Sequence, residues 1–188
     1  MKTLISTFVA VAAAYVVNAG AVVYVSESGS NTEPYDTLER ASTTLTNALA
    51  YIKGQPIEEG VRPRIKIVGK NVYKSKLDLA NVEIFGESWD ADSLSVGSQA
   101  SRILIGENVL IHTLRFTRES ASNNIDMNLY GLFEMSGQSS VISNCHIKGM
   151  WTKTVDIGYE VAGNAKAGLI THSLFTENRS NNGGTDSK

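Results

Sequence analysis

Apolar residues recur in the second half of the chain in segments that align position for position. The segments are 110–116, 141–147 and 169–175, with a weaker copy at 78–84. Their central aliphatic residues are Leu79, Ile111, Ile142 and Ile170. The steps between these centres are 111 − 79 = 32, 142 − 111 = 31 and 170 − 142 = 28 residues. A repeat whose period drifts in this way is typical of a solenoid, in which each repeat adds one layer and the loops vary in length.

Each copy contains a break in its alternation of apolar and polar positions. Apolar residues lie two positions before the centre, at the centre, and three and five positions after it. Because strict alternation describes one straight strand, the extra residue predicts a sharp corner between two short strands. The corner residues are Asn81, Thr113, Asn144 and His172, and Asn tolerates the left-handed backbone that such a corner needs. We expect two inward columns, one of Leu79, Ile111, Ile142 and Ile170, the other of Ile84, Phe116, Ile147 and Phe175.

A third short apolar run lies upstream of each copy. These runs are 65–67, 103–105, 133–135 and 159–161. Three strands in each layer predict an all-β protein, a parallel β-helix of about four coils over residues 64–178. Loops are expected mainly at 86–101, 118–131 and 149–158.

The segment before the repeats has the pattern of one strand and one amphipathic helix. Residues 22–25 are a short apolar run that predicts a strand. Asp36, with Glu39 three residues later, fits a helix N-terminus, and Gly54 followed by Pro56 fits a C-terminus. We expect residues 22–63 to form this strand and an α-helix that caps the amino-terminal end of the stack.

The first 21 residues have a different pattern. Lys2 precedes an apolar run over residues 4–17, and small residues follow at 19–21. This is the layout of a secretory signal peptide, with cleavage expected after Ala19 or Ala21. A lone membrane anchor is the alternative, although the apolar run is short for a bilayer span. The pattern favours export to a secreted or cell-surface location.

Charge and cysteine content narrow the class of protein. The formal charge of −2 over 188 residues gives no electrostatic reason to expect nucleic acid as a partner. The single cysteine, Cys145, cannot form an internal disulfide, so packing must stabilise the fold. Its position in an inward column is typical of a small buried apolar residue.

At these repeats the chain resembles the pectate-lyase-like superfamily of right-handed parallel β-helices. The resemblance extends to residues 24–31, Tyr-Val-Ser-Glu-Ser-Gly-Ser-Asn, and to 34–38, Pro-Tyr-Asp-Thr-Leu, which are similar to the amino-terminal segment of many secreted bacterial β-helix proteins. It implies a right-handed coil and an export route, and it specifies no activity. Residues 175–178, Phe-Thr-Glu-Asn, followed by Gly183 and Gly184, are similar to one copy of the polymorphic outer-membrane repeat, FxxN and then GGA, with Thr185 in place of Ala.

The last predicted coil leaves apolar side chains uncovered. Ile170 and Phe175 would face no further layer, and residues 179–188 after them form a polar tail. Soluble proteins cap such an end or continue the stack. We expect that the chain is the amino-terminal part of a longer protein or that another molecule covers this end. A complete chain whose polar tail shields the edge is the alternative.

The best candidate for chemistry is the outward column predicted for the third strands, which contains Lys66, Leu104, Glu134 and Glu160. Glu134 and Glu160 would lie about 5 Å apart on adjacent coils, where two carboxylates repel unless a cation or a shared proton intervenes. In polysaccharide lyases of the superfamily that the chain resembles, this face is the substrate groove, where acidic side chains hold calcium and an arginine or lysine is the base. The resemblance implies Glu134, Glu160, Asp126 and Asp156 as calcium ligands. The alternative is that these are solvated surface residues and that the protein has no cofactor.

The basic candidate is Arg115, which is expected to face outward between Glu83 and His146 on the neighbouring coils. An ion pair across the coils is the simpler interpretation, and no lyase-type arginine motif accompanies Arg115 or Arg118. The three histidines, His112, His146 and His172, fall in different columns. A shared zinc site is therefore not expected.

Two functions of different classes remain. The first is a non-catalytic exported surface protein, a passenger-like or adhesin-like scaffold that contacts a polysaccharide or a cell-surface glycan. The signal peptide, the resemblance at residues 175–184 and the missing lyase motif favour it. The alternative is a polysaccharide lyase or glycoside hydrolase that acts in a groove on the stack, favoured by Glu134 and Glu160. Trp89, Tyr130 and Trp151 could stack on sugar rings in either case, and neither interpretation fixes the oligomeric state.

Overall fold

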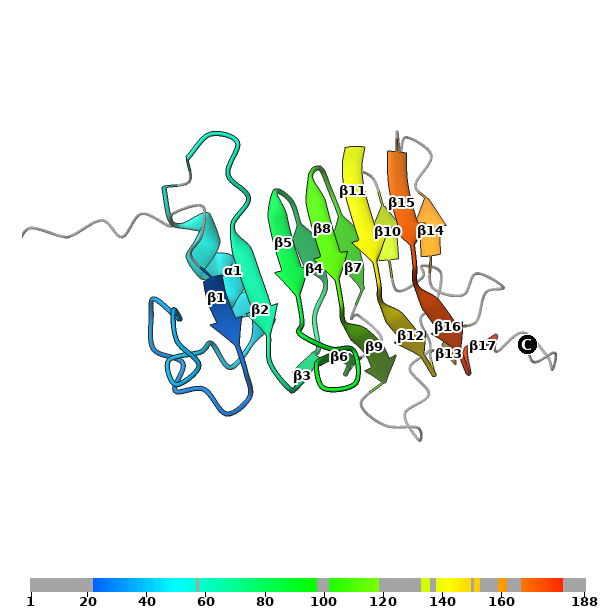
Figure 1. The fold of residues 1–188 in the computed structure, drawn as a ribbon, viewed down its shortest axis with the longest axis horizontal. Coiled ribbons are helices and arrows are strands. Elements are labelled where there is room, and N and C mark those ends of the chain that lie inside the picture. The colour runs from blue at the N-terminus through cyan, green and yellow to red at the C-terminus, as the bar shows by residue number, and fades with distance from the viewer. Residues whose placement is uncertain are drawn as a thin grey trace, which may run out of the picture.

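Short parallel strands make up most of the described chain. The computed structural model describes residues 22–56, 58–97, 102–118, 133–135, 138–149, 151–152, 159–161 and 167–180. The predicted signal peptide, residues 1–21, lies outside the described residues. The strands form three stacked sheets and one short pair, and every named strand pair is parallel (Figure 1).

The sheets differ in length. The six-stranded sheet contains β1 (Val22–Val25), β2 (Arg64–Ile67), β5 (Val82–Phe85), β8 (Val109–His112), β11 (Gln138–Ser143) and β15 (Ala167–Thr171), in this order. The five-stranded sheet contains β3 (Lys70–Tyr73), β6 (Ser93–Val96), β9 (Arg115–Arg118), β12 (His146–Lys148) and β16 (Leu174–Thr176). The four-stranded sheet contains β4 (Leu77–Leu79), β7 (Ile103–Ile105), β10 (Phe133–Met135) and β14 (Tyr159–Val161), and β13 (Trp151–Thr152) pairs with β17 (Arg179–Ser180).

The chain passes from sheet to sheet in a fixed rotation. From β4 onward it enters the four-stranded, the six-stranded and then the five-stranded sheet, and it repeats this order to β16, with β13 interposed. Each pass lays one new strand beside its predecessor in all three sheets. The described fold is therefore all-β in character, with stacked parallel sheets that fit a β-helix-like solenoid.

The register confirms the three strong copies of the repeat and corrects the weak one. In the six-stranded sheet the inward column is Val23, Ile65, Ile84, Ile111, Ile142 and Ile170. In the five-stranded sheet it is Asn71, Leu94, Phe116, Ile147 and Phe175. Leu79 instead pairs with Ile105 in the four-stranded sheet. The prediction that placed Leu79 beside Ile111, and Ile84 beside Phe116, was wrong, because it shifted this copy by one strand along the chain.

Apolar side chains from all three sheets share one interior. Phe116 of β9 and Phe133 of β10 meet edge to face, with ring centroids 5.0 Å apart. Both rings are almost fully buried, as are Ile84 and Ile111. Burial of each such side chain contributes about 1.5–3 kcal/mol to stability, so these columns are the main source of cohesion between layers.

The predicted corner residues all have left-handed backbones. Asn81, Thr113, Asn144 and His172 have φ values of 49°, 58°, 48° and 48°. They belong to two different corners, however. Asn81 lies with Asn108 where the chain leaves the four-stranded sheet, and the Asn108 amide donates to Oδ1 of Asn81 at 3.3 Å. The other three lie where the chain leaves the six-stranded sheet.

The helix is shorter than predicted at its N-terminus. Helix α1 spans Leu45–Lys53, with Thr44 as the N-cap and Gly54 as the C-cap. Gly54 was predicted correctly, whereas Asp36 as the start was wrong. The residues between instead cover the free edge of β1: Tyr24 N–H donates to the Tyr35 carbonyl at 2.8 Å, and Ser42 N–H donates to the Tyr24 carbonyl at 2.9 Å. No described helix is long and apolar enough to cross a membrane.

Two strands lie inside segments predicted as loops. Strand β6 falls within 86–101 and β13 within 149–158. The sequence of β6 is Ser-Leu-Ser-Val, in which small serines replace the β-branched residues that mark a strand. Ser93 and Ser95 are nevertheless buried, and β6 lies between β3 and β9 in its sheet.

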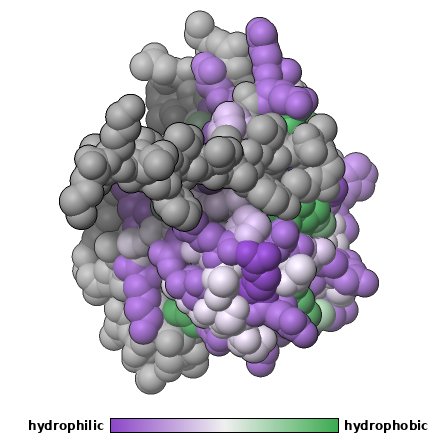
Figure 2. Space-filling model, turned by 90° about the vertical axis from the view of Figure 1, so that its left-hand side faces the viewer, coloured by the Kyte–Doolittle hydropathy of each residue, from purple (hydrophilic) through white to green (hydrophobic). Residues whose placement is uncertain are grey.

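The two ends of the stack differ in surface character. Figure 2 shows the end that carries β1 and α1, and its described surface is mostly hydrophilic. At the other end Leu169, Leu174 and Phe175 are 54%, 44% and 38% exposed. Phe175 belongs to an inward column and is exposed because it lies on the last strand of its sheet, as the sequence predicted; Ile170 is partly buried against the core.

Candidate functional site

The predicted pair of glutamates lies on neighbouring strands of the four-stranded sheet. Glu134 of β10 and Glu160 of β14 are register partners, which confirms that they lie on adjacent strands. Asp78 and Leu104 continue this column. Lys66, predicted to belong to it, lies instead in the six-stranded sheet and pairs with Glu87 at 3.1 Å.

Glu134 has a basic partner that the prediction did not name. Arg102 Nη1 lies 3.1 Å from Oε2 of Glu134, and both side chains are about three-quarters buried, being 28% and 24% exposed. Arg102 is two residues before Leu104, the register partner of Glu134. Because residues two apart in a strand share a face, this diagonal pairing could have been found from the correct register. The guanidinium neutralises one carboxylate of the candidate pair.

Of the four predicted calcium ligands, the structure describes the side chain of Glu134. Glu134 is engaged by Arg102, and calcium requires six to eight oxygen ligands. Within the described ranges, no group of three or more His, Cys, Asp or Glu side chains is placed to hold a metal ion. Asp126, Asp156 and the side chain of Glu160 lie outside the part of the structure that is described.

Arg115 lies in a different cluster from the one predicted. It is the register partner of Ser93 and His146 in the five-stranded sheet, so His146 is its neighbour as predicted and Glu83 is not. Its guanidinium pairs with Asp90 at 2.9 Å. Trp89, next to Asp90, meets the His146 ring edge to face at 5.6 Å between centroids. The 86–92 loop thus folds over the outward face of this sheet.

A buried carboxylate holds this loop in place. Asp92, 4% exposed, accepts from Gly69 N–H at 2.8 Å through Oδ1 and from Glu87 N–H at 2.7 Å and Ser88 N–H at 3.3 Å through Oδ2. Both of its oxygens are therefore used by backbone donors. The loop that carries Trp89 is anchored by Asp92 to the corner between two sheets.

A second polar cluster lies on the outward face of the six-stranded sheet. Arg64 donates twice to Glu83, at 3.1 and 3.2 Å, and His112 Nε2 lies 3.1 Å from the same carboxylate. Phe85 stacks on the His112 ring at 5.4 Å, and the Arg64 guanidinium lies 4.7 Å from the Phe85 centroid. Burial alone would raise the pKa of Glu83, but the hydrogen bonds from Arg64 and His112 outweigh burial and lower it.

The remaining titratable candidates do not converge. His112 ends β8, His146 begins β12 and His172 occupies a corner, so the described structure places them in three separate environments, as predicted. Cys145 is fully buried, and burial raises the pKa of its thiol to about 11. This supports a packing role and argues against a nucleophile.

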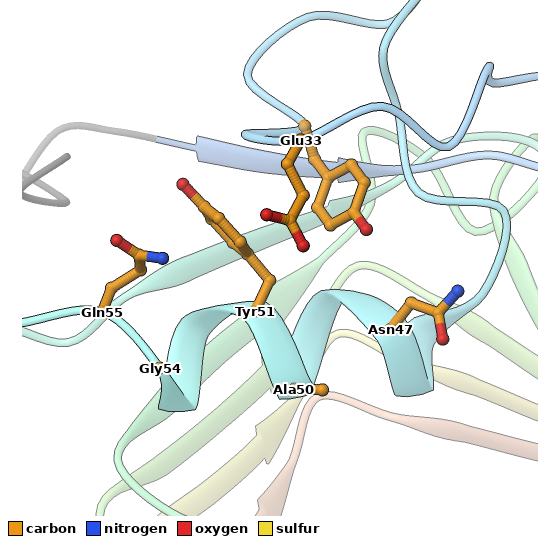
Figure 3. A pocket seen from close by; sticks show the side chains of 7 residues that line it. Glu33, Asn47, Ala50, Tyr51, Gly54 and Gln55 are labelled. Carbon is orange, nitrogen blue, oxygen red and sulfur yellow. The ribbon is translucent and has the colours of Figure 1, made fainter. Parts of the chain in front are cut away.

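One cavity lies at the helix end of the molecule, where sequence analysis predicted no site. It opens between helix α1 and the segment that contains Glu33 and Tyr35, and Tyr51 and Gln55 project into it from the helix side (Figure 3). No motif marks these residues, because the fold brings them together from separate segments.

The chain was also compared with known proteins. No protein-family model, curated protein or solved structure matches it. The class of protein is therefore defined by the described fold alone, as stacked parallel β-sheets.

Proposed function

We propose that the chain is an exported, right-handed parallel β-helix of the pectate-lyase-like kind, with about four coils and helix α1 as its cap. In this proposal it is a non-catalytic cell-surface scaffold, passenger-like or adhesin-like, that contacts a glycan. The observation that carries the proposal is that Glu134 and Arg115, the strongest described candidates for chemistry, are each tied to a partner, Arg102 and Asp90. Such pairing favours a fixed surface over a reactive one.

The 86–92 loop is the best candidate for glycan contact. Trp89 is partly exposed and lies beside His146, with the Arg115 and Asp90 pair in the same cluster. An aromatic ring bordered by polar groups is suited to a sugar, whose apolar face stacks on the ring while its hydroxyls form hydrogen bonds. Because Asp92 anchors the loop, the ring would be positioned before a ligand arrives.

A glycan array followed by titration tests this proposal. We expect the protein to bind at least one polysaccharide, and Trp89→Ala to weaken binding about fivefold, since an aromatic contact contributes about 1 kcal/mol. The control is Leu38→Ala. Leu38 is an exposed apolar residue distant in sequence from Trp89, so this variant should bind as the parent does. Unchanged binding by Trp89→Ala would reject the loop as the contact.

The enzymatic alternative depends on Glu134 and Glu160 as neighbours in register. Adjacent strands are about 4.8 Å apart, and retaining glycosidases use carboxyl groups about 5–5.5 Å apart. A degradation assay on a panel of polysaccharides with millimolar calcium distinguishes the two functions. Activity that disappears in Glu134→Gln would replace the scaffold proposal with a lyase or hydrolase.

Export is tested separately. Amino-terminal sequencing of the secreted protein should find a chain that begins after Ala19 or Ala21. A chain that stays in the cell with Met1 intact would contradict export while leaving the fold unaffected.

A further inference from the structure

The cavity beside helix α1 has the size of a small-molecule site. Its volume is about 410 Å³, within the range of roughly 300–1,000 Å³ that is usual for such sites. Tyr51, Gly54 and Gln55 line it from the C-terminal part of the helix, and Glu33 and Tyr35 line it from the opposite segment. The cavity is distant in sequence from the candidate glycan loop, so it requires a separate explanation.

The cavity beside helix α1 carries a negative charge. Among the described lining residues Glu33 is the one with a charged side chain. The Glu33 carboxylate points toward helix α1 beside the Tyr51 ring (Figure 3), and no described side chain forms an ion pair with it. The nearby Arg40 donates to the Glu33 backbone carbonyl, and its guanidinium pairs with Asp36 at 3.2 Å.

Two tyrosines form a rigid aromatic wall. The Tyr35 and Tyr51 rings meet at 71° with centroids 5.3 Å apart, and the two residues are 5% and 8% exposed. Burial, and secondarily the charge of Glu33, raise the pKa of Tyr35, which places the carboxylate within electrostatic reach of that phenol. Aromatic rings attract cations through their negative faces, most strongly where water is partly excluded.

We propose that this pocket binds a small organic cation that carries an alkylated ammonium group. Glu33 supplies the opposite charge, Tyr35 and Tyr51 supply aromatic surface for the alkyl substituents, and the amides of Asn47 and Gln55 supply hydrogen bonds at the rim. A neutral sugar fits less well, because the Glu33 carboxylate would be left without a counter-charge.

Calorimetric titration with choline tests the charge requirement. We expect choline to bind and its uncharged isostere, 3,3-dimethylbutanol, to bind up to about fivefold more weakly, because Glu33 is exposed and an exposed charge pair is worth up to roughly a fivefold change in affinity. Vesicles of phosphatidylcholine form a second arm: binding to them would identify the source as a lipid headgroup, and binding to free choline alone would identify a soluble amine.

Matched variants locate the site. Glu33→Gln should weaken choline binding about fivefold, whereas Glu39→Gln, an exposed glutamate nearby that does not line the cavity, should leave it unchanged. In the parent protein, choline should shift the amide NMR signals of Gly54 and Gln55. Equal binding of choline and its isostere, an unaffected Glu33→Gln variant, or no binding in any arm would each overturn the proposal. None of these outcomes depends on the glycan-binding experiment.

Discussion

At the scale of single residues, polar side chains on this protein act mainly by tying segments together. Asp92 is the clearest case, because three backbone donors from two segments use both of its oxygens. A buried carboxylate is costly unless its charge is satisfied. Here the backbone donors satisfy it and thereby fix the loop that carries Trp89.

Asp92→Asn should therefore lower the free energy of unfolding by about 2–3 kcal/mol, because an amide presents one acceptor and places a donor against backbone N–H groups. Urea denaturation measures this loss. Asp90→Asn is the control: the Asp90 side chain is 79% exposed in its pair with Arg115, so its loss should be below about 1 kcal/mol. Similar losses for both variants would contradict the anchoring role of Asp92.

His146 makes the free energy of unfolding depend on pH. Burial, and next the charges of Arg115 and Lys148, lower the pKa of His146, while Asp90 and Glu177 oppose them. A histidine with a lowered pKa favours the folded state when it is neutral, so its stabilisation is present above about pH 6.5 and is lost as the pH falls through its folded pKa.

Acidification from about pH 7.5 to pH 5 should thus destabilise the parent more than His146→Gln. Because the ring is partly exposed, we expect a difference below about 1 kcal/mol, measured as the change in urea midpoint at each pH. A variant with the same pH dependence as the parent would remove His146 as the source. Glu83, whose pKa is also lowered, adds a loss in the same direction only near pH 4 and below.

At the scale of elements, the corners decide how the strands connect. Thr113, Asn144 and His172 lie at the corners where the chain leaves the six-stranded sheet, and each has a left-handed backbone. That conformation costs an L-residue with a Cβ about 1–2 kcal/mol, which Asn reduces and Gly avoids.

Two substitutions at one corner test this. Asn144→Ala should lower stability by about 1 kcal/mol, because Ala lacks the local polar compensation, whereas Asn144→Gly should be close to neutral. Since Asn144 is exposed, packing changes little in either variant. Thermal melting of the pair gives the comparison, and an Ala variant as stable as the Gly variant would show that the corner carries no strain.

These corners also explain which repeat copies could be aligned from the sequence and which could not. The copies at 110–116, 141–147 and 169–175 were aligned correctly, because the inward columns require apolar residues at the same positions on both sides of the corner in every copy. The copy at 78–84 was misaligned because Asn81 marks a second kind of left-handed corner, which has the same local signature. Local sequence identifies a corner but not the two sheets that it joins.

Other errors arose where tertiary contacts outweigh local signals. Asp36 and Glu39 have the pattern of a helix start, yet residues 35–42 are needed to cover the edge of β1. For the candidate site, the sequence predicted the adjacency of Glu134 and Glu160. It also placed Leu104 beside Glu134 correctly, but the prediction did not extend to Arg102, two residues earlier, which pairs with Glu134 across the strands. The cavity at Glu33 could not be predicted, because no periodicity connects Tyr35 with Tyr51.

At the scale of the whole molecule, stability should depend on position along the stack. Ile111 and Ile170 occupy the same column, but Ile111 is 1% exposed between two neighbouring strands, whereas Ile170 lies on the last strand and is only partly buried. In a layered fold each side chain packs chiefly on the layers above and below it. A terminal residue therefore loses about half of its partners.

Alanine substitutions in an inner layer and in the last layer measure this gradient. Ile111→Ala should cost about 3–4 kcal/mol, Ile170→Ala about 1–2 kcal/mol, and Leu169→Ala, at an outward position 54% exposed, less than about 0.5 kcal/mol. Urea denaturation of the three variants gives the series. If Ile170→Ala proved as costly as Ile111→Ala, the last layer would have to be covered in solution, by another part of the chain or by a second molecule. A graded loss would instead show that the stack ends in an open apolar layer, where Phe175 and Ile170 are available for contact.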